Sequence, residues 1–116
     1  MRELYRVAWH EAGHAIAAFH YRRPIRLVTA DVEGTGATRC LELKADARSM
    51  FRGRVWRQLV QQEIVICLAG PIAEEIEHGD AESAEIDLQM ARKWLAELMM
   101  QEDLALVMRS GSLPNS

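Results

Sequence analysis

The chain has 116 residues, 49% of them hydrophobic, and its 14 Lys and Arg residues against 17 Asp and Glu residues give a formal net charge of −3 at pH 7. This size fits one small folded domain without room for a separate ATPase or DNA-reading domain, and the apolar content is too high for a disordered chain. No apolar run reaches the roughly 18 to 20 residues of a membrane span, and no signal peptide is visible, so we expect a cytoplasmic protein without a membrane partner. The two cysteines, Cys40 and Cys67, are too few for a disulfide scaffold, and we expect reduced thiols in or near the core.

The first predicted element is a helix over residues 3–21. Leu4, Ala8 and Ala15 belong to an apolar stripe at helical spacing, and the residues between them are rich in alanine. Pro24 disfavours helical geometry in the residue before it, so we expect the helix to end there.

A β-hairpin is predicted next. Residues 25–32 are rich in β-branched side chains, residues 33–36 carry two glycines, and residues 37–43 resume an extended pattern. The sequence therefore predicts two strands joined by a turn.

Helical patterns fill the rest of the chain. Residues 55–77 predict a buried helix in which Gly70-Pro71 introduces a kink or separates two helices, because proline removes a backbone hydrogen bond. A last helix is expected to begin near residues 83–85 and continue to about Met108. The predicted fold is α+β and mainly α-helical, with one domain over residues 1–109 and a flexible tail over residues 110–116.

The strongest chemical signal is an HExxH motif formed by His10, Glu11 and His14 on the first predicted helix. A helix places residues four apart on one face, so both imidazoles can bind one metal ion at about 2.0 to 2.1 Å. Glu11 flanks that position, where it can hold and deprotonate a water molecule. The motif predicts a zinc site with a catalytic glutamate.

A catalytic zinc site needs a third protein ligand. His20 stands at the last position of the longer HExxHxxGxxH pattern, but Ala17 replaces the glycine that would break the helix, so the helix should carry His20 away from the metal. In other HExxH proteases the third ligand is a carboxylate some 20 residues after the motif. Here that position would be near Glu33, which we assign to the hairpin turn. The motif by itself leaves the third ligand open.

Four segments occur in one order along the chain: HEAGHAIAA, VTADVEGTGATRCLEL, LAGPIAEEI and AEIDLQMARKW. In this order they resemble the peptidase domain of the FtsH-type ATP-dependent zinc metalloproteases, peptidase family M41. That family has HEAGHA, a VTI strand with a glycine-containing turn, LGGRxAEE and a SNDLxxA helix in the same sequence. The resemblance spans about residues 10–98 and implies that the HExxH helix, the hairpin and two or more later helices pack around Zn²⁺.

The resemblance also implies roles for individual residues. His10 and His14 correspond to zinc ligands and Glu11 to the catalytic carboxylate. Asp87 corresponds to the aspartate ligand of the family, and Glu74 to a carboxylate that supports the site.

The implied function is zinc-dependent hydrolysis of peptide bonds in unfolded or extended polypeptides. An extended substrate could pair with the hairpin by strand addition, with Val28, Thr29 and Ala30 as the expected contacts. ATP dependence would need a separate ATPase partner. The alternative is a zinc-binding interaction module without hydrolytic activity.

Two further surfaces bear on partners. A basic stretch, to which Arg39 and Arg57 belong, contains interleaved acidic residues and no aromatic stacking series, so we expect a solvated face and no nucleic-acid partner. The C-terminal segment is dense in apolar residues, including Leu95 and Met99, and predicts a homo-oligomer that covers them.

Overall fold

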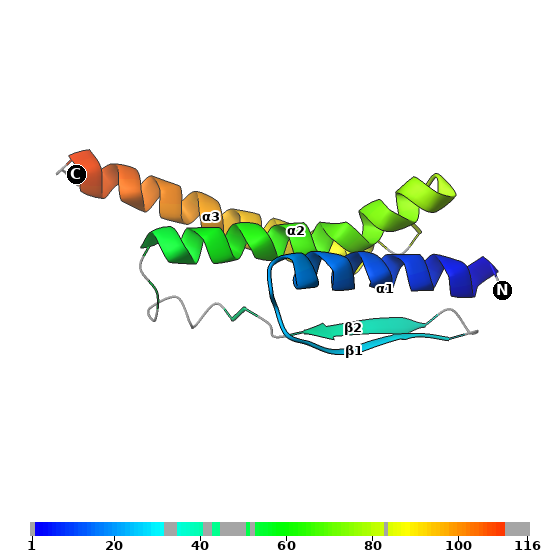
Figure 1. Cartoon of the computed structure of the whole chain (residues 1–116). Helices are drawn as coiled ribbons and strands as arrows, with labels where there is room; N and C mark the ends of the chain where they lie inside the picture. Colours follow the sequence, from blue (N-terminus) through cyan, green and yellow to red (C-terminus); the bar gives the residue numbers. More distant parts are fainter. Residues whose placement is uncertain are drawn as a thin grey trace.

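The computed structural model describes residues 2–31, 35–40, 43–44, 51, 53–82 and 84–110, and among these the side chains of residues 3 to 100. The elements follow one another as α1 (Arg2–His20), β1 (Ile25–Ala30), β2 (Gly36–Cys40), α2 (Gly53–His78) and α3 (Glu85–Ser110) (Figure 1). The mainly helical α+β class predicted from the sequence is confirmed, with two helices after the hairpin.

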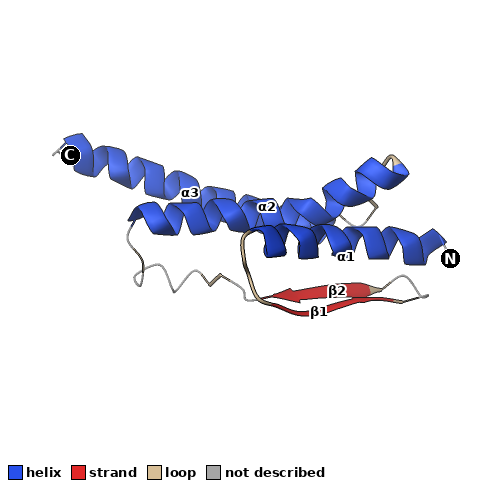
Figure 2. Ribbon diagram, in the orientation of Figure 1, coloured by secondary structure: helices blue, strands red, loops and turns tan. Residues whose placement is uncertain are grey.

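Helix α1 lies between the hairpin and α2, and it contacts both (Figure 2). Gly13 allows the close approach of α1 to α2, because a Cβ atom at this position would lie 2.3 Å from the carbonyl oxygen of Ala69. Ala17, Ala18 and Ile66 form a small buried cluster between the two helices. The small residues of α1 are therefore the ones that bring its HExxH segment against α2.

The chain leaves α1 through a tight turn. Arg22 adopts a left-handed conformation with φ of 59°, and the amide of Arg23 donates a hydrogen bond to the carbonyl of Ala18 at 2.8 Å. The guanidinium of Arg23 then reaches the carboxylate of Glu63 on α2, at 2.5 Å. This ion pair fixes the start of the hairpin to the helix behind it.

Strands β1 and β2 pair antiparallel, with Val28 opposite Thr38 and Ala30 opposite Gly36. The amide of Asp31 donates to the carbonyl of Thr35 at 2.9 Å, which closes the connection. A Cβ atom at Gly36 would lie 2.3 Å from the Val7 side chain, so the start of β2 rests directly on α1. The expected turn residues 33 and 34 and the expected strand residues 32 and 41–42 lie outside the described residues.

Helix α2 is continuous through Pro71, and Figure 1 shows that its axis bends towards its C-terminal end. This agrees with the expected kink and excludes two separate helices, because one missing hydrogen bond can be tolerated when the rest of the helix is packed. Gly79 follows with φ of 88°, a conformation that favours glycine and ends the helix.

Helix α3 packs along α2 through a second buried cluster of Trp56, Val60 and Trp94. It extends to Ser110, slightly beyond the predicted end, and the remaining residues of the expected tail, 111–116, lie outside the described part of the chain. Among the described residues, none of the helices has the length and apolar character needed to cross a membrane.

Leu95 and Met99, one turn apart on α3, are 47% and 60% exposed, and we expect the protein to self-associate through this face. Light scattering at micromolar concentration should give a mass above the 13.2 kDa of one chain. The change Met99→Glu should return the mass towards that of a monomer, since a charged carboxylate would have to be desolvated in the contact. A monomeric mass for the unmodified protein would contradict the prediction.

Candidate metal centre

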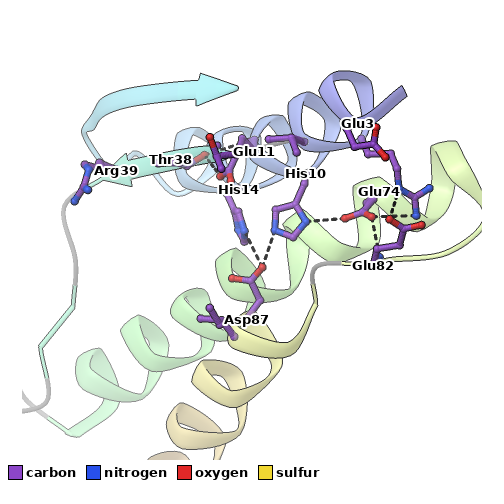
Figure 3. A pocket seen from close by; sticks show the side chains of 15 residues that line it. Glu3, His10, Glu11, His14, Thr38, Arg39, Glu74, Glu82 and Asp87 are labelled. Atoms are coloured by element: carbon purple, nitrogen blue, oxygen red, sulfur yellow. Dashed lines mark hydrogen bonds and ion pairs between the residues drawn. The ribbon is translucent and has the colours of Figure 1, made fainter. Parts of the chain in front are cut away.

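Three side chains from two helices meet at one point. His10 and His14 project from α1 towards the first turn of α3, and both Nε2 atoms face the same Asp87 oxygen, at 2.7 and 3.2 Å (Figure 3). The possible ligand atoms of these three residues all lie within 4.8 Å of one another. Among the residues that the structure describes, this is the group of His, Cys, Asp and Glu side chains able to hold a metal ion.

The other nitrogen of each imidazole has its own partner. Nδ1 of His10 lies 2.9 Å from the carboxylate of Glu74, and Nδ1 of His14 lies 2.6 Å from the backbone carbonyl of Ile66. With Nδ1 as the donor in both rings, loss of the Nε2 proton would leave each Nε2 with a lone pair directed at the position between His10, His14 and Asp87. Two imidazoles and one carboxylate match the ligand set of a catalytic zinc ion, which keeps one position for water. The residues therefore fit zinc.

The protonation equilibria of the site reflect this contact. Burial by itself lowers the pKa of His10 and of His14, but hydrogen bonds, above all to Asp87, outweigh it and raise both above the usual 6.5. Burial by itself raises the pKa of Asp87, but the hydrogen bonds from both histidines outweigh this effect and lower the pKa to about 2. Asp87 is therefore a carboxylate at neutral pH, and a metal ion would compete with protons for the two Nε2 atoms.

The three possible metal ligands line a cavity with a volume of about 780 Å³, and Glu11 lies on the wall of this cavity. Its side chain is almost fully buried, and the hydroxyl of Thr38 on β2 lies 2.8 Å from its Oε1 and 2.9 Å from its backbone carbonyl oxygen. Figure 3 shows Glu11 and Thr38 on one side of the histidines and Glu74 on the other. Thr38 thus fixes the position of the predicted catalytic carboxylate.

The structure separates the other candidates from this centre. His20 lies in the last turn of α1, where its exposed ring contacts Tyr21 with centroids 4.9 Å apart, and Glu33 lies outside the described residues. The three expected substrate contacts, Val28, Thr29 and Ala30, lie on β1. The hairpin residues that line the cavity are instead 35–39, which include most of β2.

Three groups that shape the metal centre were not indicated by the sequence. Thr38 and the carbonyl of Ile66 act only because the hairpin and α2 pack on either side of α1. Gly70 has a steric role, since a Cβ atom there would lie 2.3 Å from Nε2 of His14. Gly70 belongs to the LAGPIAEEI segment, but nothing in the sequence indicates that it faces His14.

The sequence is 31% identical, over 109 residues, to the ATP-dependent zinc metalloprotease FtsH of Acidimicrobium ferrooxidans. This stretch covers 88% of the chain and 16% of the FtsH chain, so the protein spans a small part of the relative that it matches. The predicted relation to FtsH-type proteins is thereby confirmed as a distant one. No protein-family model matches the sequence, and no solved structure matches it.

The change Gly70→Ala should weaken zinc binding, because the added methyl group would displace the ring nitrogen of His14 that faces the metal position. We expect the dissociation constant for zinc to rise about 10-fold or more, as for other changes that misplace a ligand. Gly53→Ala is the matched control, since a Cβ atom at Gly53 has no neighbour within 4 Å among the described residues. Equal zinc affinity of the two variants, measured by competition with a chelator, would contradict this role of Gly70.

Proposed function

We propose that the protein is a zinc-dependent peptidase that hydrolyses peptide bonds in unfolded or extended polypeptides. The observation that carries the proposal is the convergence of His10, His14 and Asp87 beside Glu11 in one cavity. The distant relation to a zinc metalloprotease supports the same chemistry.

His10, His14 and Asp87 would hold the metal through two nitrogens and one carboxylate oxygen. Bound zinc supplies a Lewis acid that lowers the pKa of a water molecule towards about 7. Glu11 accepts the proton of the attacking water at its carboxylate and then donates it to the leaving amine. Thr38 holds Glu11 in place for both transfers, since its hydroxyl lies 2.8 Å from Oε1.

The hairpin suggests how a polypeptide would be presented. One edge of β2 pairs with β1, and residues 35–39 line the cavity that contains the metal centre. A substrate segment added to the other edge of β2, which pairs with no strand among the described residues, would run through that cavity in an extended conformation. We therefore place the substrate along β2, one strand away from Val28, Thr29 and Ala30.

The ATP dependence in the name of the relative is a property of that protein. For this chain we propose that an ATPase, linked to it or separate, delivers unfolded polypeptide to the site. A peptide that is already unfolded should need no such help, so hydrolysis can be tested with the chain alone.

The protein should bind about one zinc ion per chain, and Asp87→Ala should weaken binding strongly because one of three ligands is lost. His20→Ala should leave the affinity nearly unchanged, since His20 lies at the far end of α1. Elemental analysis and chelator competition measure both effects. A protein that takes up no zinc, or one for which the two variants exchange their effects, would overturn the proposed metal centre.

Glu11→Gln should retain zinc and lose about 100-fold or more of the hydrolysis rate, because an amide cannot accept the proton of the attacking water. Cleavage of unfolded casein measures the rate. Glu75→Gln, an exposed glutamate on α2, is the matched control and should be as active as the unmodified protein.

The same assay separates the proposal from its alternative. A protein that binds zinc but cleaves no unfolded substrate would be a zinc-binding interaction module. Full activity of Glu11→Gln would instead remove Glu11 from the mechanism.

A further inference from the structure

A buried arginine lies beside the metal centre and takes no part in the chemistry described above. Arg6 is one helical turn before His10 on α1, and it is 4% exposed. Its guanidinium lies close to three carboxylates, 3.2 Å from Glu74 and 3.5 Å from Glu82, with a shorter hydrogen bond to Asp80. A charge buried this deeply is held by its partners and is costly to leave unpaired.

The first link from Arg6 to the metal centre is Glu74, whose two oxygens have different partners. Oε1 faces Nδ1 of His10 at 2.9 Å, whereas Oε2 faces Arg6 and also accepts a hydrogen bond from the amide of Glu82 at 2.8 Å. Arg6 therefore fixes the carboxylate that orients the ring of His10. Outer partners of this kind set the direction and tautomer of a ligating histidine.

The second link is the connection between α2 and α3. Asp80 and Glu82 both lie in this connection, which leads into α3 at Glu85, and the ligand Asp87 is in the first turn of that helix. Arg6 ties the connection to α1 from one side, while Asp87 meets α1 at the histidines. Arg6 thus holds the segment that sets the position of the first turn of α3, where Asp87 lies.

Electrostatics decides between two roles for Arg6: binding a carboxylate of the substrate, or holding the carboxylates that already surround it. Nη1 of Arg6 has no hydrogen-bond partner among the described residues, which could indicate a subsite for a substrate carboxylate. Three carboxylates already surround the guanidinium, however, and a fourth negative group would be repelled. Without Arg6 the three would repel one another, and the connection, which is exposed at Asp80 and Glu82, would be free to move outward.

We propose that Arg6 is a positioning residue of the metal centre, acting on His10 through Glu74 and on Asp87 through the connection between α2 and α3. The inference rests on the proposed function in that it requires a metal ion at His10, His14 and Asp87. It adds a residue outside the HExxH motif that determines how well the ligands are arranged.

The test compares Arg6→Met and Arg6→Lys with Arg92→Met, a matched change at an exposed arginine on α3. Chelator competition gives the zinc dissociation constant, and the visible absorption of the cobalt-loaded proteins reports the coordination geometry at full occupancy. We expect Arg6→Met to weaken zinc binding about 10- to 100-fold and to alter the cobalt spectrum. Arg6→Lys keeps the charge without the planar fork, so it should recover part of the affinity.

The outcomes separate the inference from the proposed function. Unmodified protein that binds neither zinc nor cobalt overturns both. Unmodified protein that binds metal, together with Arg6 variants whose affinity and cobalt spectrum match those of Arg92→Met, overturns the inference alone. Tighter zinc binding by Arg6→Met would also overturn it, because removal of the positive charge would then outweigh any loss of positioning.

Circular dichroism controls for folding. If Arg6→Met does not fold, Arg6→Lys decides the question by the same two measurements. Glu74→Gln provides the second route: in its background Arg6→Lys should cost less zinc affinity than in the unmodified protein, because one of the two links is already broken. Equal costs in the two backgrounds would overturn the link through Glu74.

Discussion

The arrangement of the helices around the candidate site depends on one carboxylate that faces two imidazoles. Asp87 brings the start of α3 to the HExxH face of α1, with a single oxygen 2.7 Å from His10 and 3.2 Å from His14. The two hydrogen bonds lower its pKa to about 2, so the negative charge that a metal ion requires is already present at neutral pH. The same contact joins the two ends of the described chain, because α1 and α3 otherwise pack mainly on α2.

Two glycines permit this contact, because a residue with a Cβ atom at either position would clash with its neighbours. Gly13 lets α1 approach the backbone of α2, and Gly70 leaves space for the ring of His14. Larger residues would move α1 away from α2 or turn the imidazole from Asp87. The unfavourable helix propensity of glycine is thus offset by an approach that the metal centre requires.

Strand β2 and helix α2 supply the hydrogen-bond partners that support the histidines and Glu11. Thr38 on β2 holds Glu11, the carbonyl of Ile66 on α2 holds His14, and Glu74 on α2 holds His10. The hairpin and α2 therefore act in the same way: they place hydrogen-bond partners on opposite sides of α1. A centre built in this way has its ligand atoms directed before any metal arrives, which reduces the cost of ordering them on binding.

The sequence by itself determined the features that depend on neighbouring residues. The spacing of His10 and His14 placed both rings on one helix face, Ala17 indicated that α1 would continue past the motif, and the glycines before Ala37 indicated a hairpin. Asp87 was reached only through resemblance to a family, since nothing local distinguishes it from other carboxylates at the start of a helix. The tertiary structure decided which groups meet the histidines, because Asp87 is 73 residues from His14 and Glu74 is 64 residues from His10. It also showed that β2, and not β1, is the strand that lines the cavity. Hydrophobic periodicity could not decide this, because it gives no information on which strand of a hairpin faces a neighbouring helix.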